Sequence, residues 1–190
     1  MNFNIAINSL FPTKVYSVKI QEDFCDSLVA KVINDKENWS KGLLNVNALT
    51  CGWDGLEKYE ELRHISDFIS KSILPEIGKI EKWTYNNWHT HEAWINFYQK
   101  GDSAKVHNHK YMSYCGVLIL KPGNGNLIFS SQETIEHKLR PFMPEMNGQI
   151  NESKGTLILF PDYMYHSVSD CENERISVAF NFMNKSIEDE

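Results

Sequence analysis

The sequence has no excess of basic charge and no cluster of basic residues. It contains 19 Lys and Arg against 25 Asp and Glu, which gives a formal net charge of -6, and the basic residues are scattered along the chain. A protein that holds nucleic acid usually presents a positive surface to the phosphate backbone. Nucleic acid is therefore a poor candidate for a bound partner, although the composition does not exclude it as a substrate.

Long apolar segments are also missing. No stretch approaches the run of about eighteen apolar residues that a membrane span requires. The N-terminal sequence MNFNIAINSLFPTKV lacks the basic and apolar regions of a secretory signal. We therefore expect a soluble, unexported protein that enters no membrane and resides in the cytoplasm, or in the host-cell cytoplasm if the chain is viral.

Closely spaced cysteines are absent. Cys25, Cys51, Cys115 and Cys171 lie far apart and form no CxxC motif. This spacing does not match a zinc or disulfide framework, and it favours free thiols in a reducing compartment. Pairing among the four cysteines stays an alternative.

Length and composition indicate one domain that spans residues 1–190. A chain of this length with 42% hydrophobic residues can build one full core and is too short for two comfortable ones. Residues 1 to about 80 contain an alternating segment at 14–20, which predicts a first strand, and two amphipathic helices, 22–34 and 56–74, with Pro75 at the exit of the second. We expect these helices to support a sheet.

From about residue 81 to 184 the sequence changes to short runs rich in β-branched and aromatic residues, separated by turn signals. Such spacing is typical of an antiparallel sandwich or barrel. Residues 133–154 show little periodicity and predict a long excursion of the kind that often lies beside a binding site. The expected strands are 83–87, 93–98, 113–120, 126–130, 155–160 and 175–182.

Two segments far apart in the sequence contain metal-binding and anion-binding side chains. In KVHNHKYMSYCG, His107 and His109 are two residues apart, so both imidazoles would project from one face of an extended strand. The segment FPDYMYHSVSDCENERISVAF supplies His166, then Arg175, and then Ser177 on the Arg175 face if this segment is a strand. Three imidazoles and a guanidinium then have a reason to converge.

Other histidines have simpler interpretations. His89 and His91 form a second HxH pair, but no separate downstream histidine and arginine accompany them, and we expect them at the rim of a strand. The isolated His64 and His137 are expected to be surface residues or hydrogen-bonded core residues. Packing across strands is the alternative for the HxH pair at 107 and 109.

These segments, together with SYCGVLIL, a glycine hairpin and GTLILFPDYMYH, resemble the 2-oxoglutarate and Fe(II)-dependent dioxygenases. Within that family, the chain looks most like the small, often phage-borne or bacterial, prolyl-hydroxylase-like group. The resemblance covers roughly residues 94–182. It implies a mainly β fold with a double-stranded β-helix core, jelly-roll or cupin-like, and supporting N-terminal α-helices. It also implies Fe(II) as the metal and 2-oxoglutarate and dioxygen as cosubstrates.

The family also implies roles for individual residues. Its members hold iron with a His-x-Asp/Glu pair and a distal histidine, and a downstream arginine grips the far carboxylate of 2-oxoglutarate. Carried over, the resemblance makes His107 and His166 metal ligands, Arg175 the carboxylate clamp and Ser177 its hydroxyl helper. Asn96, on a strand expected to line the barrel, is added as a cosubstrate contact.

His109 stands where the family has a carboxylate. With His109 as the third metal ligand, all protein ligands would be neutral, and the site would carry one more positive charge than a site with a carboxylate. That charge favours an anionic chelate but makes the iron harder to oxidise. Two alternatives stay open: a water takes the place of His109, or Asp102 or Asp162 reaches in from a loop.

The resulting hypothesis is a 2-oxoglutarate and Fe(II)-dependent dioxygenase that hydroxylates a protein side chain or a small molecule and releases succinate and CO2. A peptidyl proline is favoured by analogy alone. One rival is a cupin-like three-histidine enzyme that does not use 2-oxoglutarate, in which Arg175 pairs with a protein carboxylate. Asp170 and Glu174 are the expected candidates for that pairing. Another is a metal-free barrel with a binding or virion-associated role. A homodimer is left open.

Overall fold

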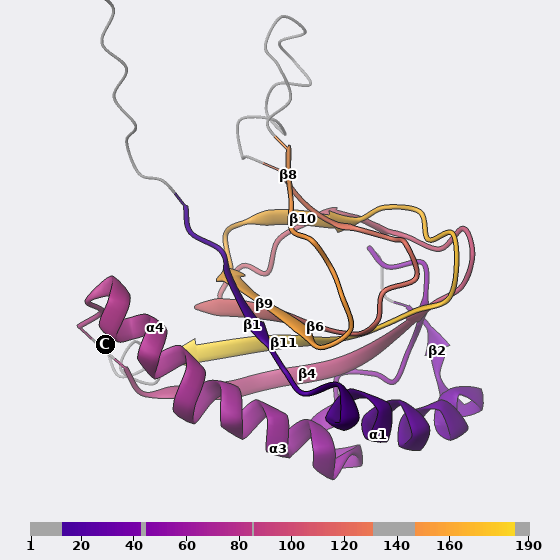
Figure 1. Ribbon diagram of the computed structural model, residues 1–190, viewed down its shortest axis with the longest axis horizontal. Coiled ribbons are helices and arrows are strands. Elements are labelled where there is room, and N and C mark those ends of the chain that lie inside the picture. Colours follow the sequence, from indigo (N-terminus) through magenta and orange to yellow (C-terminus); the bar gives the residue numbers. More distant parts are fainter. Residues whose placement is uncertain (1–12, 43–44, 85, 131–146, 185–190) are drawn as a thin grey trace, which may run out of the picture.

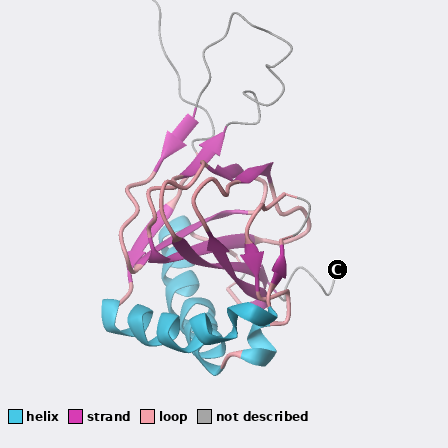
Figure 2. Cartoon of the chain, turned by 90° about the vertical axis from the view of Figure 1, so that its right-hand side faces the viewer, coloured by secondary structure: helices cyan, strands magenta, loops and turns pink. Residues whose placement is uncertain are grey.

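Two antiparallel sheets and a layer of helices form the structure, which is a computed structural model that describes residues 13–42, 45–84, 86–130 and 147–184 (Figure 1). The helices lie along the outer face of the larger sheet, and the smaller sheet lies across its inner face (Figure 2). The predicted mainly β architecture with helical support is therefore confirmed.

The larger sheet has seven strands and the smaller sheet has four. In spatial order the larger sheet contains β1 (Tyr16–Lys19), β9 (Thr156–Pro161), β6 (Tyr114–Lys121), β11 (Arg175–Asn184), β4 (Trp88–Tyr98), β3 (Leu49–Thr50) and β2 (Ser40–Lys41). The smaller sheet contains β5 (Ala104–His107), β10 (Tyr165–Val168), β7 (Leu127–Ser130) and β8 (Asn147–Gln149).

The helices are amphipathic and turn their apolar faces to the sheet. They are α1 (Glu22–Val32), a 3-10 helix η1 (Ile33–Asn38), α2 (Gly55–Lys58), α3 (Glu60–Phe68), a π-helical turn η2 (Ile69–Ile73) and α4 (Leu74–Glu81). Leu28 of α1 and Leu62 of α3 are fully buried in one apolar cluster with residues of β4, β6, β9 and β11. None of the helices in the described ranges has the length and apolar character that a membrane span needs.

The strands alternate between two environments, and this alternation sets the position of the site. On β11, Ile176, Val178 and Phe180 are buried in the cluster beneath the helices. Arg175 and Ser177, at the alternate positions, line a cavity between the two sheets. A strand buried on both faces therefore presents apolar side chains to the helices and polar side chains to the interior.

Two local predictions were wrong. Pro75 does not end the second helical segment, because it lies in the first turn of α4, where its missing N–H is tolerated, and the segment continues to Glu81. The predicted strand at 83–87 is not present in the residues described there (83, 84, 86 and 87), and β4 begins at Trp88; residue 85 lies outside the described residues. The aromatic signal at this point has another cause: the rings of Trp83 and Trp88 pack against each other with centroids 5.1 Å apart.

The four cysteines are buried and none is paired in a disulfide, as the spacing predicts.

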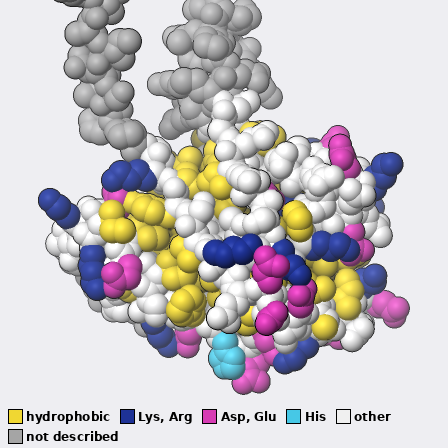
Figure 3. Space-filling model, viewed as in Figure 1, with side chains coloured by type: hydrophobic (Ala, Val, Ile, Leu, Met, Phe, Trp, Pro, Cys, Tyr) yellow, Lys and Arg dark blue, Asp and Glu magenta, His cyan; other side chains and the backbone are white. Residues whose placement is uncertain are grey.

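The excursion predicted for 133–154 is described only in part, since 131–146 lie outside the described residues and 147–149 form β8. Acidic and basic side chains are interspersed on the face drawn in Figure 3.

Gly155 offers a test of the backbone geometry. Its φ is +79°, and a Cβ built on it would lie 2.3 Å from the carbonyl oxygen of Ile20, which leaves no room for a methyl group. We expect Gly155→Ala to lower the free energy of unfolding by more than about 1 kcal/mol, measured by denaturant titration. Gly148→Ala is the control, because its Cβ would have no described atom within 4 Å. Equal stability of the two variants would contradict this geometry.

Candidate metal and cosubstrate site

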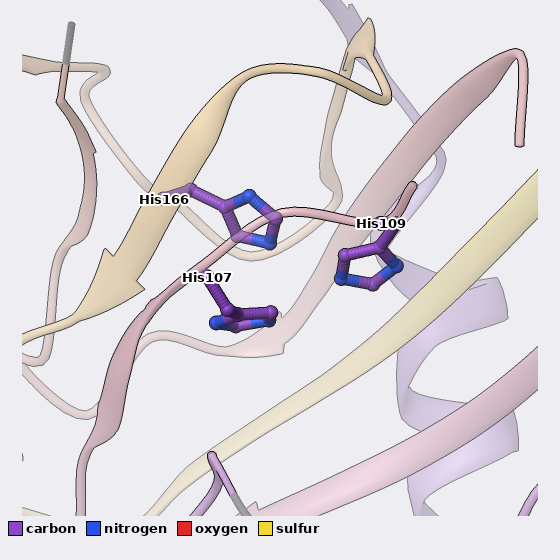
Figure 4. A group of neighbouring side chains, drawn as sticks. All are labelled: His107, His109 and His166. Atoms are coloured by element: carbon purple, nitrogen blue, oxygen red, sulfur yellow. The ribbon is translucent and has the colours of Figure 1, made fainter. Parts of the chain in front are cut away.

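His107 and His166 are brought together by strand pairing. They occupy directly opposite positions of β5 and β10. Their ring centroids lie 4.4 Å apart. Each ring centroid is 5.1 Å from that of His109, and one ligand nitrogen from each of the three rings falls within 4.8 Å of the others. Figure 4 shows the three imidazoles directed toward one another.

His109 belongs to a turn and not to the strand that the sequence predicted. The strand β5 ends at His107, so the two residues do not share one face of a continuous strand. His109 lies in the turn that follows, where its backbone N–H donates to the carbonyl of Asp162 at 3.1 Å. The predicted convergence is correct, but a turn fixed by a distant loop produces it.

Each of the three imidazoles has its Nδ1 engaged by an oxygen. The Nδ1 of His107 lies 2.7 Å from the carbonyl of Lys105, that of His166 lies 3.0 Å from the carbonyl of Met164, and that of His109 lies 2.7 Å from Oδ1 of Asn181. These oxygens can only accept hydrogen bonds, so Nδ1 is the protonated nitrogen in each ring. Each Nε2 therefore carries the free lone pair that a metal ion requires.

Burial keeps the three imidazoles neutral. Desolvation lowers the pKa of His107, and desolvation with the neighbouring histidine charges lowers the pKa of His166 well below its ordinary value. Desolvation, with a contribution from His107, lowers the pKa of His109 to about 4. A neutral imidazole is the form that binds metal, so the set is ready for a cation at neutral pH.

The other candidate ligands lie elsewhere. Within the described ranges, the group of side chains that could hold a metal consists of the three histidines alone and includes neither Asp102 nor Asp162. His89 and His91 lie on β4 outside that group. His64 is exposed on α3 beside Glu60, and His137 lies outside the described residues.

Arg175 is fully buried at the start of β11, and protein atoms engage three of its nitrogens. Its Nε donates to the carbonyl of Gly125 at 3.2 Å, its Nη1 to Oγ of Ser177 at 2.8 Å, and its Nη2 to Oε2 of Glu152 at 3.0 Å. The other carboxylate oxygen of Glu152 accepts from the backbone N–H of Leu127. The buried guanidinium thus has a buried carboxylate partner.

The predicted carboxylate partners of Arg175 were wrong. Glu174 precedes Arg175 along the chain, so its side chain points to the other side of the extended backbone and pairs with Lys121 at 2.6 Å. Asp170 is exposed in the preceding loop. Glu152 belongs to the aperiodic segment before β9, where no pattern in the sequence marks it as a partner.

A narrow inner cavity of about 40 Å³ connects the histidines with Arg175. Ser177 and Asn96 also line it, and these two residues are directly opposite each other on β11 and β4. An outer cavity of about 360 Å³ adjoins it and shares the lining residues His107, His109 and Asn96 with it. The sheets therefore place all the predicted site residues along one path from the surface to the buried guanidinium.

The sequence did not indicate the aromatic walls of the site. Trp94 stacks on His109 with ring centroids 5.9 Å apart, and Trp53 packs edge-on against Trp94. A separate groove of about 860 Å³ is lined by Tyr16, Trp83, Trp88, Tyr111, Tyr114 and Tyr163 among others. Met112 borders both this groove and the outer cavity.

Comparison with known proteins agrees with this geometry. Residues 92–181 match the family model described as "Putative 2OG-Fe(II) oxygenase". No curated protein matches the chain significantly. The chain shares the fold of a prolyl-4-hydroxylase from Pseudomonas putida, with a TM-score of 0.68, 14% identity, and coverage of 90% of this chain and 93% of that one.

Two further structures have the same fold. One is a prolyl hydroxylase from Trichoplax adhaerens in complex with a hypoxia inducible factor peptide fragment, with a TM-score of 0.69, 13% identity, and coverage of 90% and 84%. The other is HygX from Streptomyces hygroscopicus with nickel and 2-oxoglutarate bound, with a TM-score of 0.66, 10% identity, and coverage of 90% and 83%. At these identities the likeness establishes the fold alone, a double-stranded β-helix.

The fold and the matched segment, which covers just under half of the chain, make this protein similar to the 2-oxoglutarate and Fe(II)-dependent oxygenases. The matched segment runs from β4 to β11 and contains the three histidines, Arg175, Ser177 and Asn96.

Because Glu152 is the buried partner of Arg175, its loss should lower the free energy of unfolding much more than loss of the exposed Glu174. Glu152→Ala leaves a buried guanidinium without its counterion, and we expect it to lower the free energy of unfolding by roughly 3–5 kcal/mol. Glu174→Ala removes a solvent-exposed pair with Lys121 and should cost about 0–1 kcal/mol. Denaturant titration of both variants measures the difference. Similar losses for the two would show that the buried pair is not formed.

Proposed function

We propose that His107, His109 and His166 bind Fe(II) through their Nε2 atoms, and that the chain uses this metal to hydroxylate a C–H bond of its substrate. The observation that supports this proposal is the shared orientation of three neutral imidazoles, each held through Nδ1 with Nε2 directed inward. When bound, Fe(II) supplies dioxygen activation, with 2-oxoglutarate converted to succinate and CO2.

Arg175, Ser177 and Asn96 are the proposed cosubstrate contacts. A guanidinium has five N–H groups, and protein atoms accept from three nitrogens of Arg175, so one N–H on Nη1 and one on Nη2 remain for a carboxylate. Ser177 Oγ accepts from Arg175 and can donate its own hydrogen to the same carboxylate. Asn96, opposite Ser177, adds an amide on the neighbouring strand.

The rival three-histidine enzyme, which would not use 2-oxoglutarate, retains one supporting observation. It requires a protein carboxylate beside Arg175, and Glu152 meets that requirement. Glu152 does not occupy every N–H of the guanidinium, however, and the family match favours 2-oxoglutarate. The two proposals differ in whether the metal-loaded protein binds and consumes 2-oxoglutarate.

For the substrate we propose a protein side chain in an extended segment, with a small molecule as the alternative. The support is the shape of the surface: the outer cavity over the histidines adjoins the aromatic groove at Met112, so a long substrate can occupy both. Tyr and Trp rings with polar edges suit a polypeptide, and the larger groove would be unused by a small substrate.

We further propose that residues 1–190 act as one domain, with support from residues 1 to about 80 and a β-helix core from about 81 to 184. The apolar cluster that joins α1 and α3 to β4 and β11 supports a single unit. The supporting part is not purely helical, since β1, β2 and β3 also belong to it.

Metal binding should depend on the three histidines. We expect wild-type protein to bind one Co(II), used as an oxygen-stable probe, and expect His107→Ala and His166→Ala each to lose stoichiometric binding, because two imidazoles hold a divalent ion much less tightly than three. Equilibrium dialysis with metal analysis measures the stoichiometry. His64→Ala is the control, because this histidine is exposed on α3. Stoichiometric binding by the two site variants would overturn the assignment.

Cosubstrate binding should depend on the Arg175 end of the cavity. Ser177→Ala removes one hydrogen-bond partner of the carboxylate, and we expect 2-oxoglutarate affinity to fall about 3- to 10-fold with metal stoichiometry unchanged. Arg175→Met combined with Glu152→Gln removes both buried charges together and should abolish measurable binding. Isothermal titration of the anaerobic Fe(II) protein provides the readout.

Two outcomes of that titration would contradict the assigned role. One is a Ser177→Ala or double variant that binds 2-oxoglutarate as tightly as the wild type, and the other is a variant that loses its metal. Wild-type protein that holds Fe(II) but neither binds nor consumes 2-oxoglutarate would favour the three-histidine rival.

A further inference from the structure

His109 differs from the other two site histidines in what its Nδ1 contacts. The Nδ1 atoms of His107 and His166 are each bonded to a main-chain carbonyl on their own strand or turn. The Nδ1 of His109 is bonded to a side chain, Oδ1 of Asn181, at 2.7 Å. The orientation of the third imidazole therefore depends on a residue 72 positions away in the sequence.

Asn181 is itself held by a carboxylate. Its Nδ2 donates to Oε2 of Glu92 at 2.9 Å, so the three side chains form one hydrogen-bonded chain from Glu92 through Asn181 to His109. Glu92 accepts only, which fixes the amide with its NH2 toward Glu92 and its oxygen toward His109. The reverse amide orientation would place an NH2 group against the Nδ1–H of the imidazole.

The register of the strands in the larger sheet places Asn181 beside Glu92. Asn181 of β11 is directly opposite Glu92 of β4 and directly opposite Cys115 of β6. A β-bulge follows at Asn181 and Phe182, where the pairing of β11 with β4 shifts by one residue. Bulges of this kind often re-aim side chains beside active sites. The Cys115 thiol lies 3.5 Å from Oδ1 of Asn181 and adds a weak donor to the same oxygen.

We propose that Glu92 and Asn181 are positioning residues for the third metal ligand, and that Glu92 supplies from outside the ligand sphere the negative charge that a carboxylate ligand would supply inside it. A histidine ligand whose other N–H is bonded to a carboxylate is a stronger base and is held in one orientation. Here the side-chain amide of Asn181 carries this effect from Glu92 to His109. This inference rests on the proposed function, because it takes His109 as a ligand.

The charges of the site residues show why a nearby carboxylate matters for a bound cation. The three imidazoles are neutral, and the one guanidinium at the site is already matched by Glu152. Among the residues that the structure describes, a bound divalent cation would therefore have no anionic group in direct contact, and Glu92 reaches the ligand set through two hydrogen bonds. Its field lowers the free energy of the bound cation without occupying one of the metal's coordination positions.

The test is the Co(II) affinity of purified protein, measured anaerobically by competition with a chromogenic chelator. Glu92→Gln keeps an oxygen that accepts from Asn181 and removes only the charge, and we expect Co(II) affinity to fall about 10-fold with the stoichiometry unchanged. Asn181→Leu removes both hydrogen bonds, and we expect a larger loss and an altered Co(II) absorption spectrum. Glu76→Gln, a same-charge change at an exposed position of α4, is the matched control and should bind like wild type.

The histidine N–H resonances provide a second readout that does not depend on metal. In 15N-histidine-labelled apoprotein, we expect the Nδ1–H proton of His109 to be protected from solvent exchange, and to lose protection in Asn181→Leu. Unchanged Co(II) affinity in Glu92→Gln, or unchanged protection in Asn181→Leu, would overturn the inference while wild-type protein still bound metal. Failure of wild-type protein to bind Co(II) through the histidines would instead overturn the proposed function.

Discussion

The structure depends on the pairing of β5 with β10, because this pairing places His166 directly opposite His107 between the two sheets. Buried polar atoms are costly unless they have partners. The Nδ1 atoms of the three site histidines have oxygen partners, and the Nε2 atoms face one another across a small space. Three lone pairs directed at one point repel each other, so a cation is the partner that satisfies them best.

The second constraint is charge. In the dioxygenases that this chain resembles, a carboxylate ligand lies on the metal and an arginine grips the cosubstrate. In the site proposed here a neutral imidazole takes the third ligand position, and two carboxylates of the described residues lie one step away from it, Glu152 on Arg175 and Glu92 on Asn181. On this proposal, the negative charge lies on the residues that hold the metal ligands and the cosubstrate and not on a metal ligand. Glu92 belongs to a strand of the larger sheet, and Glu152 is held against β7 by the backbone N–H of Leu127.

Much of this arrangement was predictable from local patterns. The alternation of β11 put Arg175 and Ser177 on one face, and the structure has them hydrogen-bonded there. The apolar stripes gave the helices, and the pair at 107 and 109 pointed to the metal site. Local patterns failed at Pro75, which follows a π-helical turn and lies in the first turn of α4, where its missing N–H is tolerated, so the helical segment continues past it. They also failed where the cause was not local.

The carboxylates could not be assigned from the sequence for a related reason. Glu152 reaches Arg175 from a segment without periodicity, and the contact between Glu92 and Asn181 depends on the register of two strands that are 89 residues apart at this point. Register between distant strands and the path of an irregular segment are set by tertiary packing. Neither leaves a signature in the spacing of residues along one chain.

The central claim is that one cation is bound by the three Nε2 atoms with 2-oxoglutarate between it and Arg175. A crystal structure of the protein grown anaerobically with Fe(II) and 2-oxoglutarate tests it most directly. The account predicts an anomalous iron peak at the point where the three Nε2 atoms converge, with the far carboxylate of 2-oxoglutarate on Arg175 and Ser177. An iron peak elsewhere, or a 2-oxoglutarate molecule that does not reach Arg175, would contradict it.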